Sequence, residues 1–281
     1  MERNPPKPAF TYTTGIWQDI PHDDDPFAPA ISRCFGFDVH GDLLKNAGWF
    51  EYLLLLFKGE PPARWQARLL EKVAMVLTNP GPRDASVRAA MAGGTGGSPD
   101  ATVLIAALGI GAGQQGGAHE VETLVNAWSH CDTELTAWQA FFENPDKDYV
   151  EDVWAPYEHA PGFAPHGARC AATIIHSLEY LASISQGHRL TWLQAQRPTL
   201  EKLQQKPLAM PAVIAAAFAD LGLAPSQASM LFLILRLPGA AAHALEQRAL
   251  GWKASPFYAP GIELQDDPGA HPLPDISRFD L

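Results

Sequence analysis

The chain has 281 residues, of which 47% are apolar and 18% are charged, a balance typical of a folded protein with a core large enough to need no cross-links. Its formal net charge is −11, with an isoelectric point near 5.3, which argues against binding to a nucleic-acid backbone. The three cysteines are far apart and show no CxxC spacing, so neither a disulfide framework nor a zinc site is predicted.

The N-terminal sequence lacks the apolar stretch of a signal peptide, and the apolar runs are short for a bilayer. We therefore expect a cytoplasmic protein without a membrane partner. Residues 1–34 are rich in proline and aspartate and are predicted to form an extended arm. Residues 255–281 are predicted to form a second, proline-rich arm.

Between the arms the apolar spacing is helical. The first helix is predicted over 41–59, where Gly59 and the prolines beyond it form a stop signal. Further helices are predicted over 62–78, 85–94, 99–113, 120–142, 168–187, 191–206, 210–222 and 225–251. Breaks are expected at Pro198 and at Pro238. No alternating strand of convincing length is found, so the predicted fold class is all-α.

The segment 99–113 is nearly all apolar, which predicts a helix that is packed on every side. The helices across 213–236 have the same character. Because these helices lack a polar face, each must be covered on all sides, and we predict a homodimer with two-fold symmetry formed through 101–113 and 213–236.

Several polar residues follow apolar or glycine-rich segments. Arg236 ends a strongly apolar run and therefore needs an anion, either a ligand or an internal partner such as Glu246. His119, after two glycines, is either a satisfied buried histidine or an acid–base group. Arg83 precedes a helix start with Asp84 near the N-cap, which is an anion site or an ordinary capping loop.

The loop 161–167 leads into a helix, and its backbone N–H groups lie near His166 and Arg169 in the sequence. Such an arrangement binds anions when the N–H groups point at the ligand. An ordinary loop rich in proline and glycine is the alternative.

The order of these motifs resembles the citrate synthase family, especially its short members and the citryl-CoA lyase module of ATP-citrate lyase. The resemblance covers roughly residues 35–260. It rests on LLLLFKGEPP (53–62), NPGPRD (79–84), AGQQGGA (112–118), PGFAPHG (161–167), AMPAVIAAAFADLG (209–222) and RLPGAAAHALEQ (236–247).

The resemblance implies a large helical domain (35–121 and 213–281), a smaller inserted helical domain (122–212), a dimer, and an active site in the cleft. It implies a CoA thioester and a di- or tricarboxylate as ligands, with no permanently bound cofactor and no metal. Arg236 and His243 match the family's pattern directly, and Arg236 matches a carboxylate-binding arginine.

Four of the family's site positions are changed. Gln115 stands where a histidine stabilises the enol of the thioester, and Pro80 replaces the histidine that binds the keto acid. Pro211 falls at the place of the catalytic aspartate. Pro165 replaces the loop histidine, with His166 one residue later.

Two functions remain open on the sequence. The first is a lyase or synthase acting on a CoA thioester and a polycarboxylate. Its candidate catalytic residues are Gln115, His119 and His166, and its candidate substrate-binding residues are Arg83, Arg169, Arg236 and His243. The second is a non-catalytic binding or regulatory homologue, or a partner subunit, that keeps the cleft. An unrelated helical bundle is a third, less informative interpretation.

Overall fold

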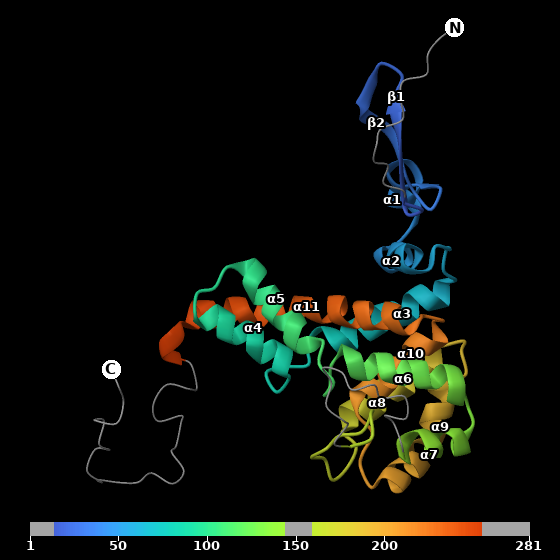
Figure 1. Ribbon diagram of the computed structural model, residues 1–281, viewed down its shortest axis with the longest axis vertical. Coiled ribbons are helices and arrows are strands. Elements are labelled where there is room, and N and C mark those ends of the chain that lie inside the picture. Colours follow the sequence, from blue (N-terminus) through green and yellow to red (C-terminus); the bar gives the residue numbers. More distant parts are fainter. Residues whose placement is uncertain (1–13, 144–158, 255–281) are drawn as a thin grey trace, which may run out of the picture.

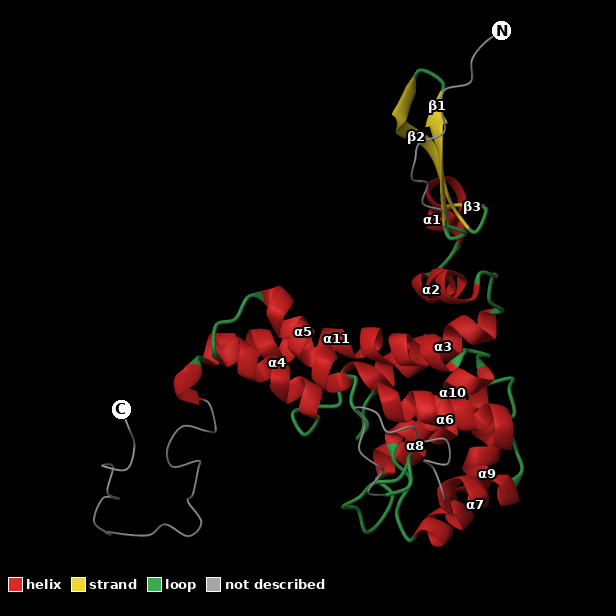
Figure 2. Ribbon diagram, viewed as in Figure 1, coloured by secondary structure: helices red, strands yellow, loops and turns green. Residues whose placement is uncertain are grey.

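A computed structural model describes residues 14–143 and 159–254. It confirms the all-α class (Figures 1 and 2). The described helices are α1 (Leu44–Asn46), α2 (Trp49–Lys58), α3 (Arg64–Thr78), α4 (Ala85–Thr95), α5 (Asp100–Gly111), α6 (Ala118–Cys131), α7 (Leu135–Glu143), α8 (Ala172–Ile184), α9 (Arg189–Gln204), α10 (Met210–Asp220) and α11 (Pro225–Leu250), with a short π-helix at Val39–Leu43 and a 3₁₀ turn at Trp252–Ala254. The predicted C-terminal arm lies outside the described residues.

The prediction of an arm without strands is wrong for its described part. Strands β1 (Trp17–His22) and β2 (Asp25–Cys34) form an antiparallel hairpin, and the two-residue strand β3 (Phe37–Asp38) pairs with β2. The hairpin projects away from the helices (Figure 2). Its alternation is hard to read in the sequence because the register shifts around Pro21, which lies opposite Pro29.

At its base the hairpin contacts α2. The ring of Phe35 lies against Gly59, so closely that an added Cβ on Gly59 would stand 3.1 Å from it. Gly59 ends α2 in the left-handed conformation, with φ of 76°, as the predicted stop signal requires.

The proline breaks predicted within helices are also wrong, because α9 continues through Pro198 and α11 through Pro238. In α11 the neighbouring turn is supported from α3, where the Thr78 hydroxyl donates to the Leu235 carbonyl over 3.2 Å. Gly239 allows this approach, since a Cβ there would collide with the Thr78 carbonyl.

Two other predicted helices are interrupted. The segment 41–59 is divided at Ala47, whose backbone is extended, and a new helix starts with Gly48 as its N-cap. The segment 120–142 is divided at Asp132, which has a φ of 38°. In both cases local backbone geometry ends one helix while the apolar spacing continues into the next.

Because α11 is unbroken, the expectation that no apolar segment is long enough for a bilayer is wrong. By length and composition this helix of 26 residues, with a mean hydropathy of 1.5 in its most apolar window, would suffice. In the structure it packs against α3, α4, α5 and α6, as a core helix does. The absence of a membrane partner stays a prediction.

The buried residues form two clusters along α11. The larger one joins α2, α3, α6 to α10 and the N-terminal half of α11. The smaller one lies between α4, α5 and the C-terminal half of α11, and its buried members are Ala90, Val103, Ala107, Ala240 and Ala244. The domain boundaries inferred from the family resemblance stay a prediction.

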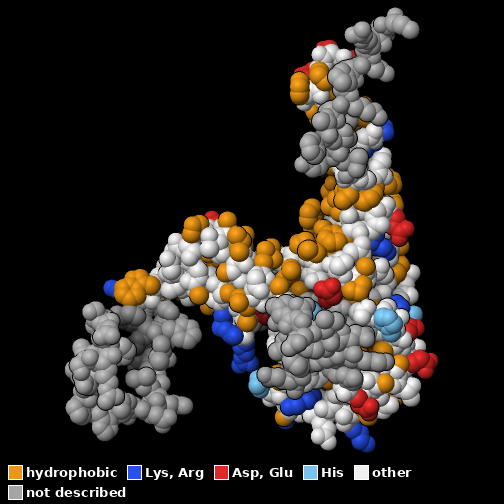
Figure 3. Space-filling model, in the orientation of Figure 1, with side chains coloured by type: hydrophobic (Ala, Val, Ile, Leu, Met, Phe, Trp, Pro, Cys, Tyr) orange, Lys and Arg blue, Asp and Glu red, His pale blue; other side chains and the backbone are white. Residues whose placement is uncertain are grey.

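The apolar helices differ in how well one chain covers them. Helix α10 is covered within the chain, and Ile214 and Phe218 are both fully buried. Helix α5 is not packed on every side within this chain, because Ile105 is 66% and Ile110 is 53% exposed. Figure 3 shows apolar side chains on the surface around α4 and α5 and around α2.

Candidate functional site

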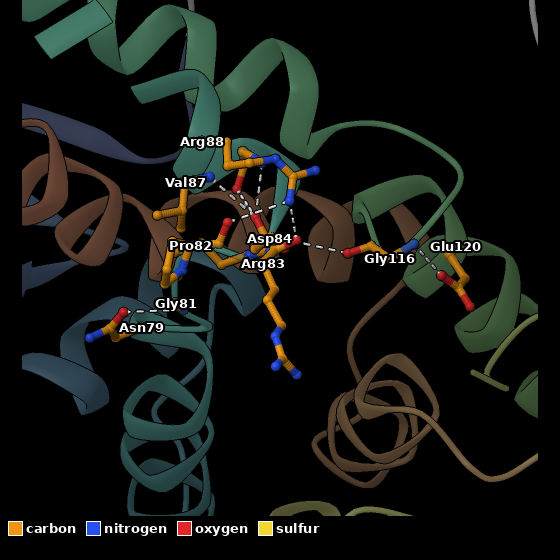
Figure 4. Close-up of polar contacts among 11 residues, drawn as sticks. Asn79, Gly81, Pro82, Arg83, Asp84, Val87, Arg88, Gly116 and Glu120 are labelled. Carbon is orange, nitrogen blue, oxygen red and sulfur yellow. Dashed lines mark hydrogen bonds and ion pairs between the residues drawn. The ribbon is translucent and has the colours of Figure 1, made fainter. Parts of the chain in front are cut away.

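The centre of the candidate site is Arg236, in the middle of α11. Only 7% of the residue is exposed, as expected for a charge that ends an apolar run. Its Nη2 forms an ion pair with the Asp84 carboxylate, and its Nη1 donates to the Gly116 carbonyl over 3.1 Å (Figure 4). The guanidinium also lies over the Phe232 ring, 4.7 Å from its centroid. Arg236 therefore joins the 79–86 turn to the 112–118 loop.

Asp84 is also the N-cap of α4, as its place in the sequence predicts. Its Oδ1 accepts hydrogen bonds from the backbone N–H groups of Ser86 and Val87, over 2.9 and 3.3 Å. Its Oδ2 faces Arg236. The internal ion pair foreseen for Arg236 thus exists, but its partner is Asp84 rather than Glu246.

A second link is made by Glu120, in the first turn of α6, which the sequence analysis did not single out. It is 3% exposed. One carboxylate oxygen accepts from the Gly116 N–H over 2.6 Å, and the other accepts from the Gly162 N–H over 2.7 Å. Glu120 therefore ties the 112–118 loop to the 161–167 loop. The sequence feature that could have identified Glu120 is an acidic residue in the first turn of a helix that follows two glycines.

Together Arg236 and Glu120 connect three of the motif loops in one polar network. The peptide at Gly116 lies at its middle, because its carbonyl accepts from Arg236 and its N–H donates to Glu120 (Figure 4). Gly116 has a φ of 68°, a conformation that glycine adopts readily and most side chains do not. The adjacent Gly117 has no room for a side chain against the carbonyls of the preceding loop.

Burial raises the pKa of Glu120 above its ordinary value near 4.5, and the hydrogen bonds from Gly162 and Gly116 only partly oppose this shift. The folded state therefore holds this proton to a higher pH than the unfolded state does. Its contribution to stability is complete at low pH and is lost as the pH rises through the raised pKa.

We expect this loss of stability with rising pH to appear when the unmodified protein is compared with Glu120→Gln. The unfolding free energy of the unmodified protein, relative to that of the variant, should fall as the pH rises from 4.5, with a slope of at most about 1.4 kcal/mol per pH unit. Urea denaturation at a series of pH values measures it. Glu60→Gln, at a side chain that is 70% exposed, is the control. A rising difference for Glu120→Gln would contradict the assignment.

The candidate catalytic residues lie on two of these loops. Gln115 is exposed next to Gly116. His119 is half-buried in the first turn of α6, where its backbone N–H donates to the Ala112 carbonyl over 3.3 Å. His166 is exposed on the 161–167 loop. Their catalytic roles stay predictions.

The candidate substrate-binding residues are less closely grouped. Arg83 is exposed, and its side chain points away from Asp84 (Figure 4). Arg169 is exposed at the end of its loop. His243 places Nε2 2.9 Å from the Asn79 side-chain oxygen, so it supports the 79–86 turn. Of the four, only Arg236 belongs to the polar network.

The structure also locates the substituted positions. Pro211 lies in the first turn of α10, where a proline is well accommodated but supplies no acid or base. The Pro165 carbonyl accepts from Lys206 over 2.7 Å. A small apolar pocket lies nearby, and its lining includes Trp128, Trp138, Trp192, Phe163 and Ala212. Among the described residues, its lining offers no charged partner to a carboxylate.

No protein-family model matches the chain, and no curated protein matches its sequence. Among solved structures, the chain is similar to citryl-CoA lyase from Hydrogenobacter thermophilus, with a TM-score of 0.68 and 19% identity over 94% of this chain and 97% of the other.

Two further structures match equally well. They are ATP citrate lyase from Methanothrix soehngenii in complex with citrate and coenzyme A, and a mutant ATP citrate lyase from Methanosaeta concilii in complex with (3S)-citryl-CoA. Each has a TM-score of 0.68 and 18% identity over 94% of this chain, which spans 42% of each ATP citrate lyase chain. These matches confirm the citrate synthase-like fold that the order of motifs implies, in the form seen in citryl-CoA lyase.

Proposed function

We propose that the protein binds a CoA thioester together with a di- or tricarboxylate and catalyses aldol-type cleavage or formation of a carbon–carbon bond, as a citryl-CoA lyase does. The observation that carries this proposal is the polar network around Arg236, which ties together three of the loops on which the family resemblance rests. The solved structures that share this fold include one in complex with citrate and coenzyme A.

The chemistry needs two groups. A base must take the proton of the substrate hydroxyl, for which His119 and His166 are the candidates. A donor must stabilise the departing enolate, a role suited to the Gln115 amide with neighbouring backbone N–H groups. The enolate carbon then takes a proton from the protonated base or from water, which completes the cleavage. Arg83, Arg169, Arg236 and His243 are the proposed contacts of the substrate carboxylates.

A second candidate function is a binding or regulatory homologue without catalysis. It is favoured by Pro211 in the first turn of α10, where the resemblance places the catalytic base, and by the pairing of Arg236 with Asp84. In that case the fold would recognise the thioester and leave it unchanged.

A thermal-shift screen tests ligand binding, with CoA, acetyl-CoA, citrate and oxaloacetate as probes. Binding to the folded state stabilises it by about 2.7 kcal/mol when the ligand is at 100 times its dissociation constant. We expect CoA and citrate to raise the midpoint. Incubation with citryl-CoA, followed by mass spectrometry of the products, then separates the lyase from the non-catalytic homologue. No shift with any of the probes contradicts both functions.

We also propose a homodimer. Helix α11 exposes Met230, Ile234 and Leu245, which lie on one face at spacings of 4 and 11 residues, and α5 exposes Ile105 and Ile110. A monomeric protein rarely leaves so many large apolar side chains together in water. The proposed interface is therefore formed by α5 and α11, because α10 is already covered within the chain.

Ile234→Glu should shift the dimer toward a monomer of 30.5 kDa in sedimentation velocity at micromolar concentration. The reason is that a carboxylate would have to be buried in the interface without a partner. Met75→Glu places the same charge at an apolar side chain of α3 that is 68% exposed, and it should leave the dimer intact. A monomeric unmodified protein would rule the dimer out.

A further inference from the structure

We propose that Asp84 is a specificity-determining residue, because its carboxylate occupies the carboxylate-binding edge of Arg236 from within the chain. A polycarboxylate must displace Asp84 to reach the guanidinium, and its affinity is lowered accordingly. This inference rests on the proposed function, since it concerns the ligand that the same site takes.

The contact between the two residues is incomplete. A guanidinium binds a carboxylate best through two parallel N–H groups, which Nε and Nη2 offer along one edge. Asp84 uses only Nη2, and Gly116 uses Nη1 from the other side. The Arg236 Nε is buried and finds no hydrogen-bond partner among the residues that the structure describes. A carboxylate that reached both Nε and Nη2 would therefore satisfy one more donor than Asp84 does.

The capping role of Asp84 explains why it does not do so itself. Its Oδ1 accepts from the N–H groups of Ser86 and Val87 and from the Ser86 hydroxyl, which fixes the carboxylate at the start of α4. Only Oδ2 remains for the arginine. A free carboxylate has no such obligation and can turn both oxygens toward the guanidinium.

The surroundings make this competition consequential. The side chains of Arg236 and Asp84 are only 8% and 18% exposed, so each charge depends on the other for compensation. Gly116, whose carbonyl contacts the arginine, is exposed, as is Gln115 beside it. The ion pair therefore lies directly against an exposed loop, through the contact of Arg236 with the Gly116 carbonyl.

Asp84→Asn separates the two roles of the residue. Asparagine caps helices about as well as aspartate and has the same shape, but it carries no charge. The variant should keep α4 while leaving the buried guanidinium without an anion. Asp84→Ser, which also preserves a capping oxygen, is a second variant if the first folds poorly.

The chain offers a matched control. Asp100 lies in the first turn of α5 and binds Arg248, which is also on α11, over 2.7 Å. This pair is exposed, with side chains 39% and 78% accessible for Arg248 and Asp100. Asp100→Asn makes the same chemical change in a pair that water already solvates.

The experiment is calorimetric titration of citrate and, separately, of CoA into each protein. We expect Asp84→Asn to bind citrate at least about tenfold more tightly than the unmodified protein, as one added charge-assisted contact predicts. Without ligand its thermal midpoint should be lower, and citrate should raise that midpoint more than it does in the unmodified protein. Asp100→Asn should match the unmodified protein, and the gain should vanish in Asp84→Asn combined with Arg236→Gln.

Different results would contradict the role of Asp84 and the proposed function. Unchanged or weaker citrate binding by both Asp84 variants, with CoA binding retained, overturns the role of Asp84 and leaves the proposed function standing. Failure of all the proteins to bind CoA or citrate overturns the proposed function itself.

Discussion

Purified protein should release free CoA from acetyl-CoA and oxaloacetate only at the background rate. The α-proton of a thioester is weakly acidic, so its removal needs a positioned base and a donor to the enolate oxygen at the same time. Pro211 in the first turn of α10 cannot act as the base, and Gln115 cannot shuttle a proton. Loss of a general acid or base costs about 10²–10⁴-fold in rate. A thiol-release assay measures the rate at which CoA is formed.

Gln115→His should not restore this reaction, because the base would still be missing. Gln115 is exposed, so the substitution should leave the thermal midpoint unchanged, which shows that any lack of activity is chemical rather than structural. Turnover of several per second by the unmodified protein would show that another group supplies the base.

Arg236→Ala should lower the free energy of unfolding by about 3–5 kcal/mol, the usual cost of removing one partner from a buried ion pair. The loss has three parts: Asp84 keeps a nearly buried charge, the Gly116 carbonyl loses its donor, and the Phe232 ring loses the guanidinium above it. Urea denaturation, followed by circular dichroism, gives the difference.

Arg248→Ala is the control on the same helix. Its pair with Asp100 is exposed, and such pairs contribute about 0–1 kcal/mol. If the two substitutions had equal effects, the contact of Arg236 with Asp84 would not be a structural link between α11 and α4. The same result would remove the energetic basis for competition at the guanidinium.

The helical core could be predicted from the sequence because its signals are local. The apolar spacing predicts most of the helices. Gly59 indicates the end of α2, and the position of Asp84 indicates the N-cap of α4. The order of the motifs gave the fold, which similarity to solved citryl-CoA lyase structures confirms.

The polar network could not be predicted because its contacts join distant parts of the chain. Arg236 and Asp84 are 152 residues apart, and Glu120 and Gly162 are 42 apart. No spacing rule relates such residues, so Glu246, only ten positions away, was the natural partner to suggest for Arg236. The continuity of α11 through Pro238 is likewise decided by tertiary contact, through Thr78 of α3.

The hairpin of β1 and β2 has a consequence for any measurement of stability. The hydrophobic clusters found in the described part of the chain include no residue before Phe50. Only the end of β2 is buried against the helices, where Cys34 is fully buried and contacts Tyr52 of α2, so most of the hairpin lies outside the helical core. A two-stranded hairpin alone is marginally stable in water. Amide protons of β1 and β2 should therefore exchange with deuterium through local opening, while those of α10 exchange only when the whole core unfolds. A single unfolding free energy describes the helices and says little about the first described strands.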